Sequence, residues 1–196
     1  MNRIAEIERQ TGETQISLRL NLDGTGEHRV NTGIGFFDHM LTLVAVHGLF
    51  DLEVRCQGDL HVDSHHTVED VGIALGQACH QALGNRERLR RIGVSYVPLD
   101  ESLARVVIDL SGRGFLRLQA ELSHVQAGQF PGELVEDFFQ AFAINSKSTI
   151  HAELLAGRNG HHQIEVLFKA LARALRAAAE VDPRQSGIPS SKGILV

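Results

Sequence analysis

The chain has little that would mark a secreted or membrane protein. Its two cysteines, Cys56 and Cys79, are too few for a disulfide framework, so reduced thiols and a cytoplasmic location are expected. It contains no apolar run of about 18 residues, the length that a membrane-spanning helix needs. Its first ten residues mix charged and polar side chains, a pattern that does not predict a secretory signal.

Basic residues are not in excess either. The chain has 19 Lys and Arg against 24 Asp and Glu, which gives a net charge of -5. Proteins that bind nucleic acid usually present a basic face, so nucleic acid is not expected as the partner. The length of 196 residues fits one domain, or two small halves that share one core.

Histidine, in contrast, is abundant, with 11 residues in a chain that has no tryptophan and one tyrosine. The motif His-His-x-x-Glu occurs at residues 65–69 and again at residues 161–165, each time before an apolar-periodic run. A single histidine at the start of a helix is usually a cap or a surface residue. Because the pair recurs together with its glutamate, and histidine is the commonest metal ligand, the duplication favours metal binding.

The order of the predicted elements also repeats. Alternating apolar residues predict a strand at 16–22, and residues 23–26 read as a hairpin turn to a return strand at 27–31. The remaining expectations are helices at 36–47, 65–83, 133–143 and from the second motif to 179, and strands at 52–56, 103–110, 115–122 and 149–155.

This repetition predicts an internal duplication with an α+β fold. The first repeat would span residues 1–90 and the second residues 91–181, with the join near residues 86–97. Residues 182–196 are rich in Pro, Ser and Gly, so we expect an extended or mobile C-terminal tail.

The helical spacing of the motif has a chemical consequence. His65 and Glu69 are four residues apart and share a face, whereas His66 lies about 100° round the helix from His65. Adjacent histidines are therefore expected to serve two different metal ions. Two motifs then give two sites, each drawing on both halves of one chain or on neighbouring chains. Imidazole and carboxylate ligands without thiolate suit Mn, Fe, Zn, Co or Ni.

Other residues are candidates on weaker grounds. His39 lies within a predicted helix and His151 within a predicted strand, and both are candidates for further ligands. A set of basic and hydroxyl residues is suited to binding phosphate, although such residues are more often ordinary solvated side chains. This set is Arg91, Arg113, Lys169, Ser190, Ser191 and Lys192.

Six segments together resemble the imidazoleglycerol-phosphate dehydratase family of histidine biosynthesis, in order and with the family's spacing. They are FFDHML (36–41), HHTVED (65–70), PLDE (98–101), SGR (111–113), HHQIEVLFKA (161–170) and PSSKG (189–193). The resemblance runs from Arg9 to the C-terminus. It implies two similar halves, each a four-stranded sheet with two helices, with the helices packed between the sheets.

The resemblance also implies the contents of the site. Two manganese ions would be held by His39, His65, His66, Glu69, His151, His161, His162 and Glu165. Phosphate would be bound by Arg91, Arg113, Lys169, Ser190 and Lys192. The family further implies a cubic homo-oligomer of twenty-four chains with sites shared between subunits. Glu13 matches an acidic residue near the reacting carbons, and our catalytic candidates are Glu13, His65 and Glu165.

The implied reaction converts D-erythro-imidazole glycerol phosphate to imidazole acetol phosphate and water. The proton lost from C2 is not adjacent to a carbonyl group, so we expect the reaction to use a di-manganese-bound imidazolate as its electron source. Two residues depart from the family pattern: Ser64 stands where many members have Asp, and Leu43 where many have Gln. Neither is a ligand, so the expected activity is unchanged.

Two other functions remain open at this stage. A dinuclear metal-dependent phosphoesterase would also use two metal ions, although such enzymes usually have more carboxylate ligands than this histidine-dominated set. A non-catalytic metal-binding oligomer would have no need for Glu13 or for the basic set.

Overall fold

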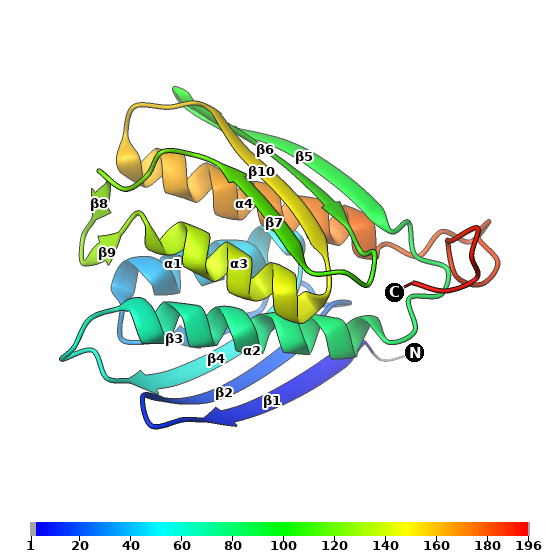
Figure 1. Cartoon of the computed structure of the whole chain (residues 1–196), viewed down its shortest axis with the longest axis horizontal. Coiled ribbons are helices and arrows are strands. Elements are labelled where there is room, and N and C mark those ends of the chain that lie inside the picture. Colours follow the sequence, from blue (N-terminus) through cyan, green and yellow to red (C-terminus); the bar gives the residue numbers. More distant parts are fainter. Residues whose placement is uncertain (1–2, 196) are drawn as a thin grey trace.

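The computed structural model describes residues 3–195 of the chain. Two four-stranded sheets form the outer layers, and four helices lie between them (Figure 1). The predicted α+β architecture of two similar halves is confirmed, because each of these sheets is built from one half of the sequence. Among the described residues, no helix combines the length and the apolar character that crossing a membrane requires.

The first half contributes one sheet, with the strand order β1-β2-β4-β3. Burial alternates along β2, where Ile16, Leu18 and Leu20 are buried, so one face of the sheet is turned toward the helices. The elements of this half are β1 (Ile4–Gln10), β2 (Thr14–Asn21), β3 (His28–Asn31), α1 (Gly35–Gly48), β4 (Asp51–Gly58) and α2 (His65–Leu83).

The predicted hairpin at residues 23–26 is wrong. β3 does not return along β2 but pairs with β4 in parallel, so α1 is the crossover between two parallel neighbours. Asp51, the first residue of β4, explains this path. Its Oδ1 accepts hydrogen bonds from the backbone N–H groups of Thr25 (2.8 Å) and Glu27 (3.2 Å), which hold the segment before β3 against the start of β4.

The second half repeats the topology, with the strand order β5-β6-β10-β7. β7 pairs in parallel with β10, so the strand predicted at residues 115–122 is likewise joined to its neighbour by a crossover, through α3. The elements are β5 (Ile92–Leu99), β6 (Ser102–Asp109), β7 (Phe115–Gln119), β8 (Gln126–Ala127), β9 (Phe130–Pro131), α3 (Leu134–Ser146), β10 (Thr149–Ala156) and α4 (Gly160–Ala179).

The sequence predicted residues 86–97 as the join between the two repeats. Strand β5 occupies much of this segment. Its inward position Gly93 is buried and small, whereas its outward positions Val94 and Tyr96 are exposed. The small residue is required because a Cβ on Gly93 would lie 2.0 Å from the carbonyl oxygen of Ala174 on α4. Most of the large apolar residues of this strand therefore face outward, and Val97 is the one that enters the core.

The two halves share one core because α2 packs on α3 and α1 packs on α4. Gly76 lets α2 approach α3 closely, since a Cβ there would lie 2.8 Å from the carbonyl oxygen of Phe142. Buried phenylalanines fill the centre, and the rings of Phe138 and Phe168 stack with their centroids 5.1 Å apart. The helices that carry the His-His-x-x-Glu motifs are thus fixed from both sides.

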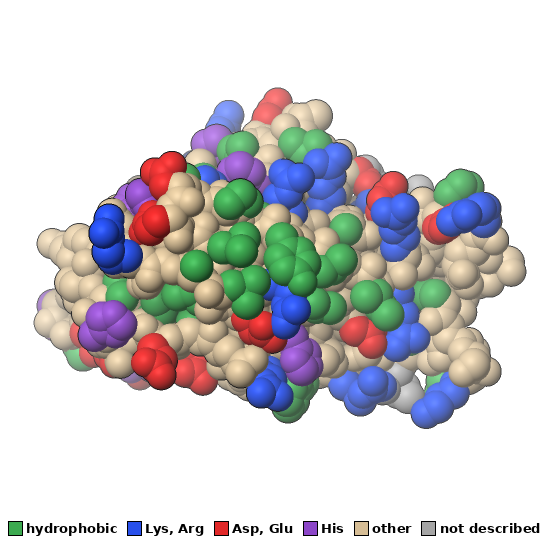
Figure 2. All heavy atoms as spheres, turned by 90° about the horizontal axis from the view of Figure 1, so that it is seen from above, with side chains coloured by type: hydrophobic (Ala, Val, Ile, Leu, Met, Phe, Trp, Pro, Cys, Tyr) green, Lys and Arg blue, Asp and Glu red, His purple; other side chains and the backbone are tan. Residues whose placement is uncertain are grey.

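The outer faces of the two sheets differ in polarity. Outward positions of β2 carry polar side chains such as Ser17 and Arg19. On the second sheet, Ile92, Val94 and Tyr96 are 60%, 56% and 55% exposed, and we call these three residues the apolar outer face. Figure 2 shows hydrophobic side chains gathered near the middle of this side of the molecule. Exposed apolar patches usually mark interaction surfaces.

The segment after α4 lies against the start of β5. The backbone N–H of Arg88 donates to Gly187 O (2.8 Å), and that of Asp182 donates to Arg88 O (2.8 Å). Arg91 Nη1 donates to Pro189 O (2.9 Å). These bonds hold the C-terminal segment at the end of the molecule where α4 ends, away from the end where α4 begins (Figure 1).

Candidate metal-binding site

Two histidines and one carboxylate from both halves of the chain meet between α1 and α4. His39 Nε2 lies 3.3 Å from Glu165 Oε2, and His161 Nε2 lies 3.0 Å from the same oxygen. The potential ligand atoms of all three residues are within 4.8 Å of one another. His161 and Glu165 share a face of α4, and the packing of α1 against α4 adds His39. This donor set suits a divalent transition-metal ion.

The carboxylate of Glu165 is oriented by Lys169, which forms an ion pair with Oε1. Burial alone would raise the pKa of Glu165, but Lys169, His161 and His39 more than offset that effect and hold the pKa below its ordinary value. Oε2 therefore faces the two histidines as an ionised oxygen, which fits a bound cation. The ring of Phe36 packs edge-on against His161, with the centroids 5.0 Å apart.

The first motif forms a related cluster on α2. His65 Nε2 lies 3.8 Å from Glu69 Oε2, and His65 Nδ1 lies 3.5 Å from Asp137 Oδ2 on α3. α1 and α3 each end at a residue with a left-handed backbone conformation, Leu49 and Lys147 respectively. When the two helices are aligned at these residues, Asp137 of α3 corresponds to His39 of α1. The two clusters are thus copies of one arrangement, with a carboxylate in one where the other has an imidazole.

The second histidine of the first motif has separate partners. The rings of His65 and His66 are 6.0 Å apart at 80°, as expected for adjacent helical positions. His66 Nδ1 lies 3.0 Å from Asp59 Oδ2, and Nε2 lies 3.5 Å from Glu13 Oε1. The hydrogen bond to Asp59 raises the pKa of His66, and the charge of Glu13 adds to this effect.

The second histidine of the second motif faces Glu101. His162 Nδ1 lies 2.9 Å from Glu101 Oε2, while Glu101 Oε1 accepts from the backbone N–H groups of Arg158 (3.1 Å) and Asn159 (2.7 Å). The hydrogen bond from His162, followed by that from Asn159, holds the pKa of Glu101 well below its usual range. Asn159 also caps α4, since its side chain accepts from the N–H groups of His161 and His162.

His151 does not join these clusters within one chain. It lies on β10 and points outward from the second sheet, where its ring is 6.0 Å from that of Phe115. From His151 the strand runs to Ala156, a distance of about 17 Å, before the turn into α4. His151 therefore lies toward the opposite end of the sheet from the other predicted ligands.

The predicted phosphate-binding residues are also divided. Arg91 pairs with Asp109 through Nε (2.7 Å), and its backbone N–H donates to Ala178 O near the end of α4. Lys169 lies about 13 Å back along that helix, close to the histidines. Ser190 and Lys192 belong to the C-terminal segment, and Arg113 lies in the loop after β6. Within one chain these residues do not converge on one point.

Ser64 and Leu43, the two residues that depart from the family pattern, do not disturb the helices in which they lie or which they precede. Ser64 precedes α2, but its side chain makes no capping hydrogen bond. Asp63 acts instead, since its Oδ1 accepts from the backbone N–H of His65 at 2.8 Å. Leu43 is partly buried and packs against the core.

Sequence reasoning assigned no role to three acidic residues that contact the motif histidines, namely Asp59, Glu101 and Asp137. The duplication itself held a signal for two of them. Glu101 follows the first strand of its half as Glu13 does, and Asp137 occupies the place of His39. Asp59 had no such signal, because its contact with His66 depends on the turn between β4 and α2.

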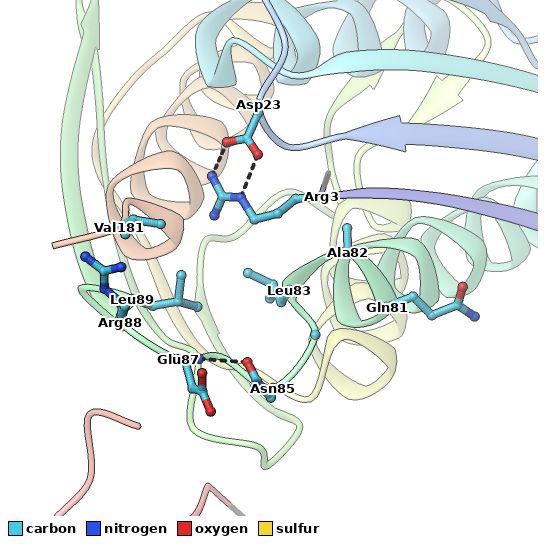
Figure 3. A pocket seen from close by; sticks show the side chains of 11 residues that line it. Arg3, Asp23, Gln81, Ala82, Leu83, Asn85, Glu87, Arg88, Leu89 and Val181 are labelled. Atoms are coloured by element: carbon cyan, nitrogen blue, oxygen red, sulfur yellow. Dashed lines mark hydrogen bonds and ion pairs between the residues drawn. The ribbon is translucent and has the colours of Figure 1, made fainter. Parts of the chain in front are cut away.

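A cavity of about 810 Å³ lies elsewhere, at the C-terminal end of α2 (Figure 3). Arg3 and Asp23, which form an ion pair, line it together with Leu83, Leu89 and Val181. None of the predicted ligands or phosphate-binding residues lines this cavity. The candidate site is therefore the surface formed by the starts of α1, α2 and α4.

Comparison with known proteins identifies relatives along the whole chain. The family model "Imidazoleglycerol-phosphate dehydratase" matches residues 32–175. A protein of that name from Methylobacillus flagellatus is 56% identical over 194 residues, which cover 98% of each chain. Another from Acetivibrio thermocellus is 54% identical over 195 residues and covers 100% of both.

Two solved structures have the same fold. The imidazoleglycerol-phosphate dehydratase of Staphylococcus aureus has a TM-score of 0.83 and 41% identity, over 91% of this chain and 99% of that one. The Pyrococcus furiosus enzyme, solved in complex with (S)-C348, has a TM-score of 0.83 and 31% identity, over 96% of this chain and 100% of that one.

Proposed function

The chain belongs to the imidazoleglycerol-phosphate dehydratase family, lyases of histidine biosynthesis, and from this premise we propose a reaction at a two-manganese site. The reaction removes water from D-erythro-imidazole glycerol phosphate and gives imidazole acetol phosphate. The observation that carries the proposal is the meeting of His39 with His161 and Glu165, which joins ligands from both halves of the chain. We assign the activity to the cytoplasm, in keeping with two free, buried cysteines.

The metal ligands in this proposal are histidine-rich and contain no thiolate, a donor set that manganese accepts. When bound, manganese would act as a Lewis acid that stabilises the substrate's ring as an imidazolate. Each His-His pair would divide its two rings between the two ions, in line with the T-shaped arrangement of both pairs. The ligands are His39, His65, His66, Glu69, His151, His161, His162 and Glu165.

Glu13 is the residue of this chain that we assign to proton transfer. It lies at the turn between β1 and β2 and is exposed toward the site, with Oε1 3.5 Å from His66 Nε2. Loss of the C3 hydroxyl and of the C2 proton leaves an enol, which becomes the ketone. A carboxylate within reach of C2 or C3 would move these protons. His65 and Glu165, which lie on the same surface, complete the catalytic set.

We further propose that each complete site is shared between chains of a large homo-oligomer. In the folded molecule, His151 and most of the proposed phosphate-binding residues lie toward the opposite end from the paired histidines (Figure 1). A second copy would bring one end against the other and supply Arg91, Arg113, Ser190 and Lys192 to the phosphate. The apolar outer face, Ile92, Val94 and Tyr96, offers a surface for such contacts. The family resemblance suggests twenty-four chains.

The test is an assay of the manganese-loaded protein with D-erythro-imidazole glycerol phosphate. The expected product contains a ketone and keeps its phosphate group. Release of inorganic phosphate would indicate the phosphoesterase instead. Manganese binding without any turnover would indicate a non-catalytic metal-binding oligomer. A metal-stripped sample that keeps both its full size and its full activity would overturn the shared two-manganese site.

A further inference from the structure

The duplication places two glutamates in corresponding positions. Glu13 lies between β1 and β2, and Glu101 lies between β5 and β6, the first two strands of each half. Each faces the second histidine of the motif in its own half, His66 and His162 respectively. Residues that descend from the same position would be expected to do the same work, but their contacts differ.

The difference lies in the ring nitrogen that each glutamate faces. Glu101 Oε2 is 2.9 Å from His162 Nδ1, whereas Glu13 Oε1 is 3.5 Å from His66 Nε2. In the first half the Nδ1 position is already taken, because Asp59 lies 3.0 Å from it. A carboxylate accepts hydrogen bonds and does not donate when ionised, so Asp59 and Glu101 each fix a proton on the Nδ1 that they face.

A side chain at the position that corresponds to Asp59 in the second half would displace its neighbours. The strands β4 and β10 correspond, and the residue that follows each is Asp59 in one case and Gly157 in the other. A Cβ on Gly157 would lie 2.7 Å from both Gln163 Cγ and Ser102 Oγ. The carboxylate that meets His162 Nδ1 comes instead from Glu101, in the turn between β5 and β6.

We propose that Glu101 is a positioning residue for His162, in the role that Asp59 has for His66, and that Glu13 alone of the duplicated glutamates remains for proton transfer. A carboxylate on Nδ1 fixes the orientation of the ring and leaves Nε2 with its lone pair, the form that binds a metal ion. The inference rests on the proposed function, because the task assigned to the ring is metal binding.

The other contacts of Glu101 agree with a positioning role. Its Oε1 accepts from the backbone N–H groups of Arg158 and Asn159, so the same side chain holds the residues just before α4 and the ring of His162. Its side chain is 32% exposed, against 54% for Glu13. The more exposed glutamate is the one without such a backbone anchor, which leaves it accessible to a substrate.

The test compares Glu101→Gln with Glu13→Gln in the full-length, assembled protein. In Glu101→Gln the amide oxygen of the new side chain can still accept from the two backbone N–H groups, but its NH2 group then faces Nδ1. This favours the other tautomer, in which Nε2 carries the proton and cannot bind metal. We expect Glu101→Gln to weaken manganese binding at one of the two sites by about 10–100-fold, and Glu13→Gln to leave both affinities unchanged.

Manganese titrations followed by electron paramagnetic resonance give the affinities, and Asp59→Asn is the matched variant at the other ring. Asp59→Asn is expected to weaken one site by a similar factor. Equal affinities in Glu101→Gln and the parent protein would overturn the proposal, and so would an equal loss in Glu13→Gln. Far-ultraviolet circular dichroism checks that each variant is folded.

A second measurement separates this inference from the proposed function. In a metal-free crystal structure of Glu101→Ala, the ring of His162 is expected to move while that of His66 keeps its position. An unmoved His162 ring would overturn the positioning role whatever metal the protein binds. If the parent protein takes up no manganese, the proposed metal is wrong, and the crystal structure still decides the role of Glu101.

Discussion

At the scale of single residues, the two rings within each His-His pair have different surroundings. His161 faces Glu165 on its own helix, and His162 faces Glu101 from a strand turn. His65 and His66 are divided in the same way between Glu69 and Asp59. The adjacent histidines therefore have separate acidic partners, which orient the two rings in different directions. A single ion bound by both rings of a pair would not fit this arrangement.

Glu13 provides a prediction about catalysis. Glu13→Gln keeps the size of the side chain but removes the carboxylate to which we assign proton transfer, so turnover should fall about 100-fold or more. Manganese content, measured by elemental analysis, should stay at the parent level. Glu8→Gln, an exposed change on β1, serves as the control and should leave turnover unaffected. Parent-level turnover in Glu13→Gln would remove Glu13 from the mechanism.

At the scale of elements, α2 ends against a buried arginine. Arg86 donates hydrogen bonds to the carbonyl oxygens of Leu110 (3.1 Å) and Ser146 (2.8 Å), and its Nη2 lies 3.1 Å from His80 Nδ1. Burial, then the charges of Arg86 and Lys147, lower the pKa of His80. The neutral ring is the form that accepts from Arg86, so protonation would place two cations in contact.

This contact predicts a pH dependence of stability. The folded-state pKa of His80 is below that of the unfolded chain, about 6.5, so the unfolded state takes up the proton first as pH falls. The stabilisation is complete above about pH 6.5 and is lost as pH falls toward the folded-state value. Urea unfolding at pH 7.5 and 5.5, at fixed protein concentration, should show a smaller loss of stability for His80→Gln than for the parent.

The matched control for that measurement is His124→Gln, a change in an exposed loop. His47, whose pKa is also lowered by burial, contributes a loss of the same sign, so His80→Gln should reduce the pH dependence without abolishing it. A parent-like dependence in His80→Gln would show that the contact with Arg86 does not control it.

The packing of α2 against α3 predicts that a glycine-to-alanine change within α2 lowers the stability of the protein. An alanine in the middle of a helix normally stabilises it by up to about 1 kcal/mol relative to glycine. At Gly76 the added Cβ would lie 2.8 Å from Phe142 O, so Gly76→Ala should instead lower the free energy of unfolding by about 1–3 kcal/mol. Gly35→Ala, at the start of α1, has nothing within 4 Å of its Cβ and should not destabilise. Equal unfolding midpoints for the two variants would contradict this account.

At the scale of the whole molecule, the chain carries two different ends and two different faces. The paired histidines lie where the long helices begin, and the C-terminal segment with Ser190 and Lys192 lies where α4 ends (Figure 1). The outer face of the first sheet carries polar side chains on β2, whereas β5 of the second sheet exposes the apolar outer face. A chain built in this way is suited to pairing one end with the opposite end of another copy.

If the apolar outer face is a contact between copies, a charge placed on it should change the size of the assembly. Val94→Lys places a charge in the middle of that face, so the proposed homo-oligomer should dissociate into smaller species while each chain stays folded. Light scattering coupled to size-exclusion chromatography measures the mass, and turnover should fall with the assembled fraction. Ser17→Lys, on the polar outer face of the first sheet, is the control. A parent-sized particle in Val94→Lys would exclude this face as a contact between copies.

Part of the fold followed directly from the sequence because the signals were local. The motif at residues 65–69 and its apolar-periodic run predicted α2, and the second motif predicted α4. The strand β5 was missed because its inward residue Gly93 is small and three of its apolar residues, Ile92, Val94 and Tyr96, face outward. The parallel pairing of β3 was missed because it depends on Asp51, a residue of a different strand.

Local patterns were sufficient to predict an internal duplication with histidine-rich helix starts, because repeated motifs and hydrophobic periods are properties of neighbouring residues. Its motifs were also sufficient to indicate the family. Tertiary structure alone decided which partners meet. His39 reaches Glu165 because α1 packs on α4, and Glu101 reaches His162 because a strand turn lies beside the start of α4. Such contacts join residues far apart in the chain, and their geometry depends on the packing of whole elements.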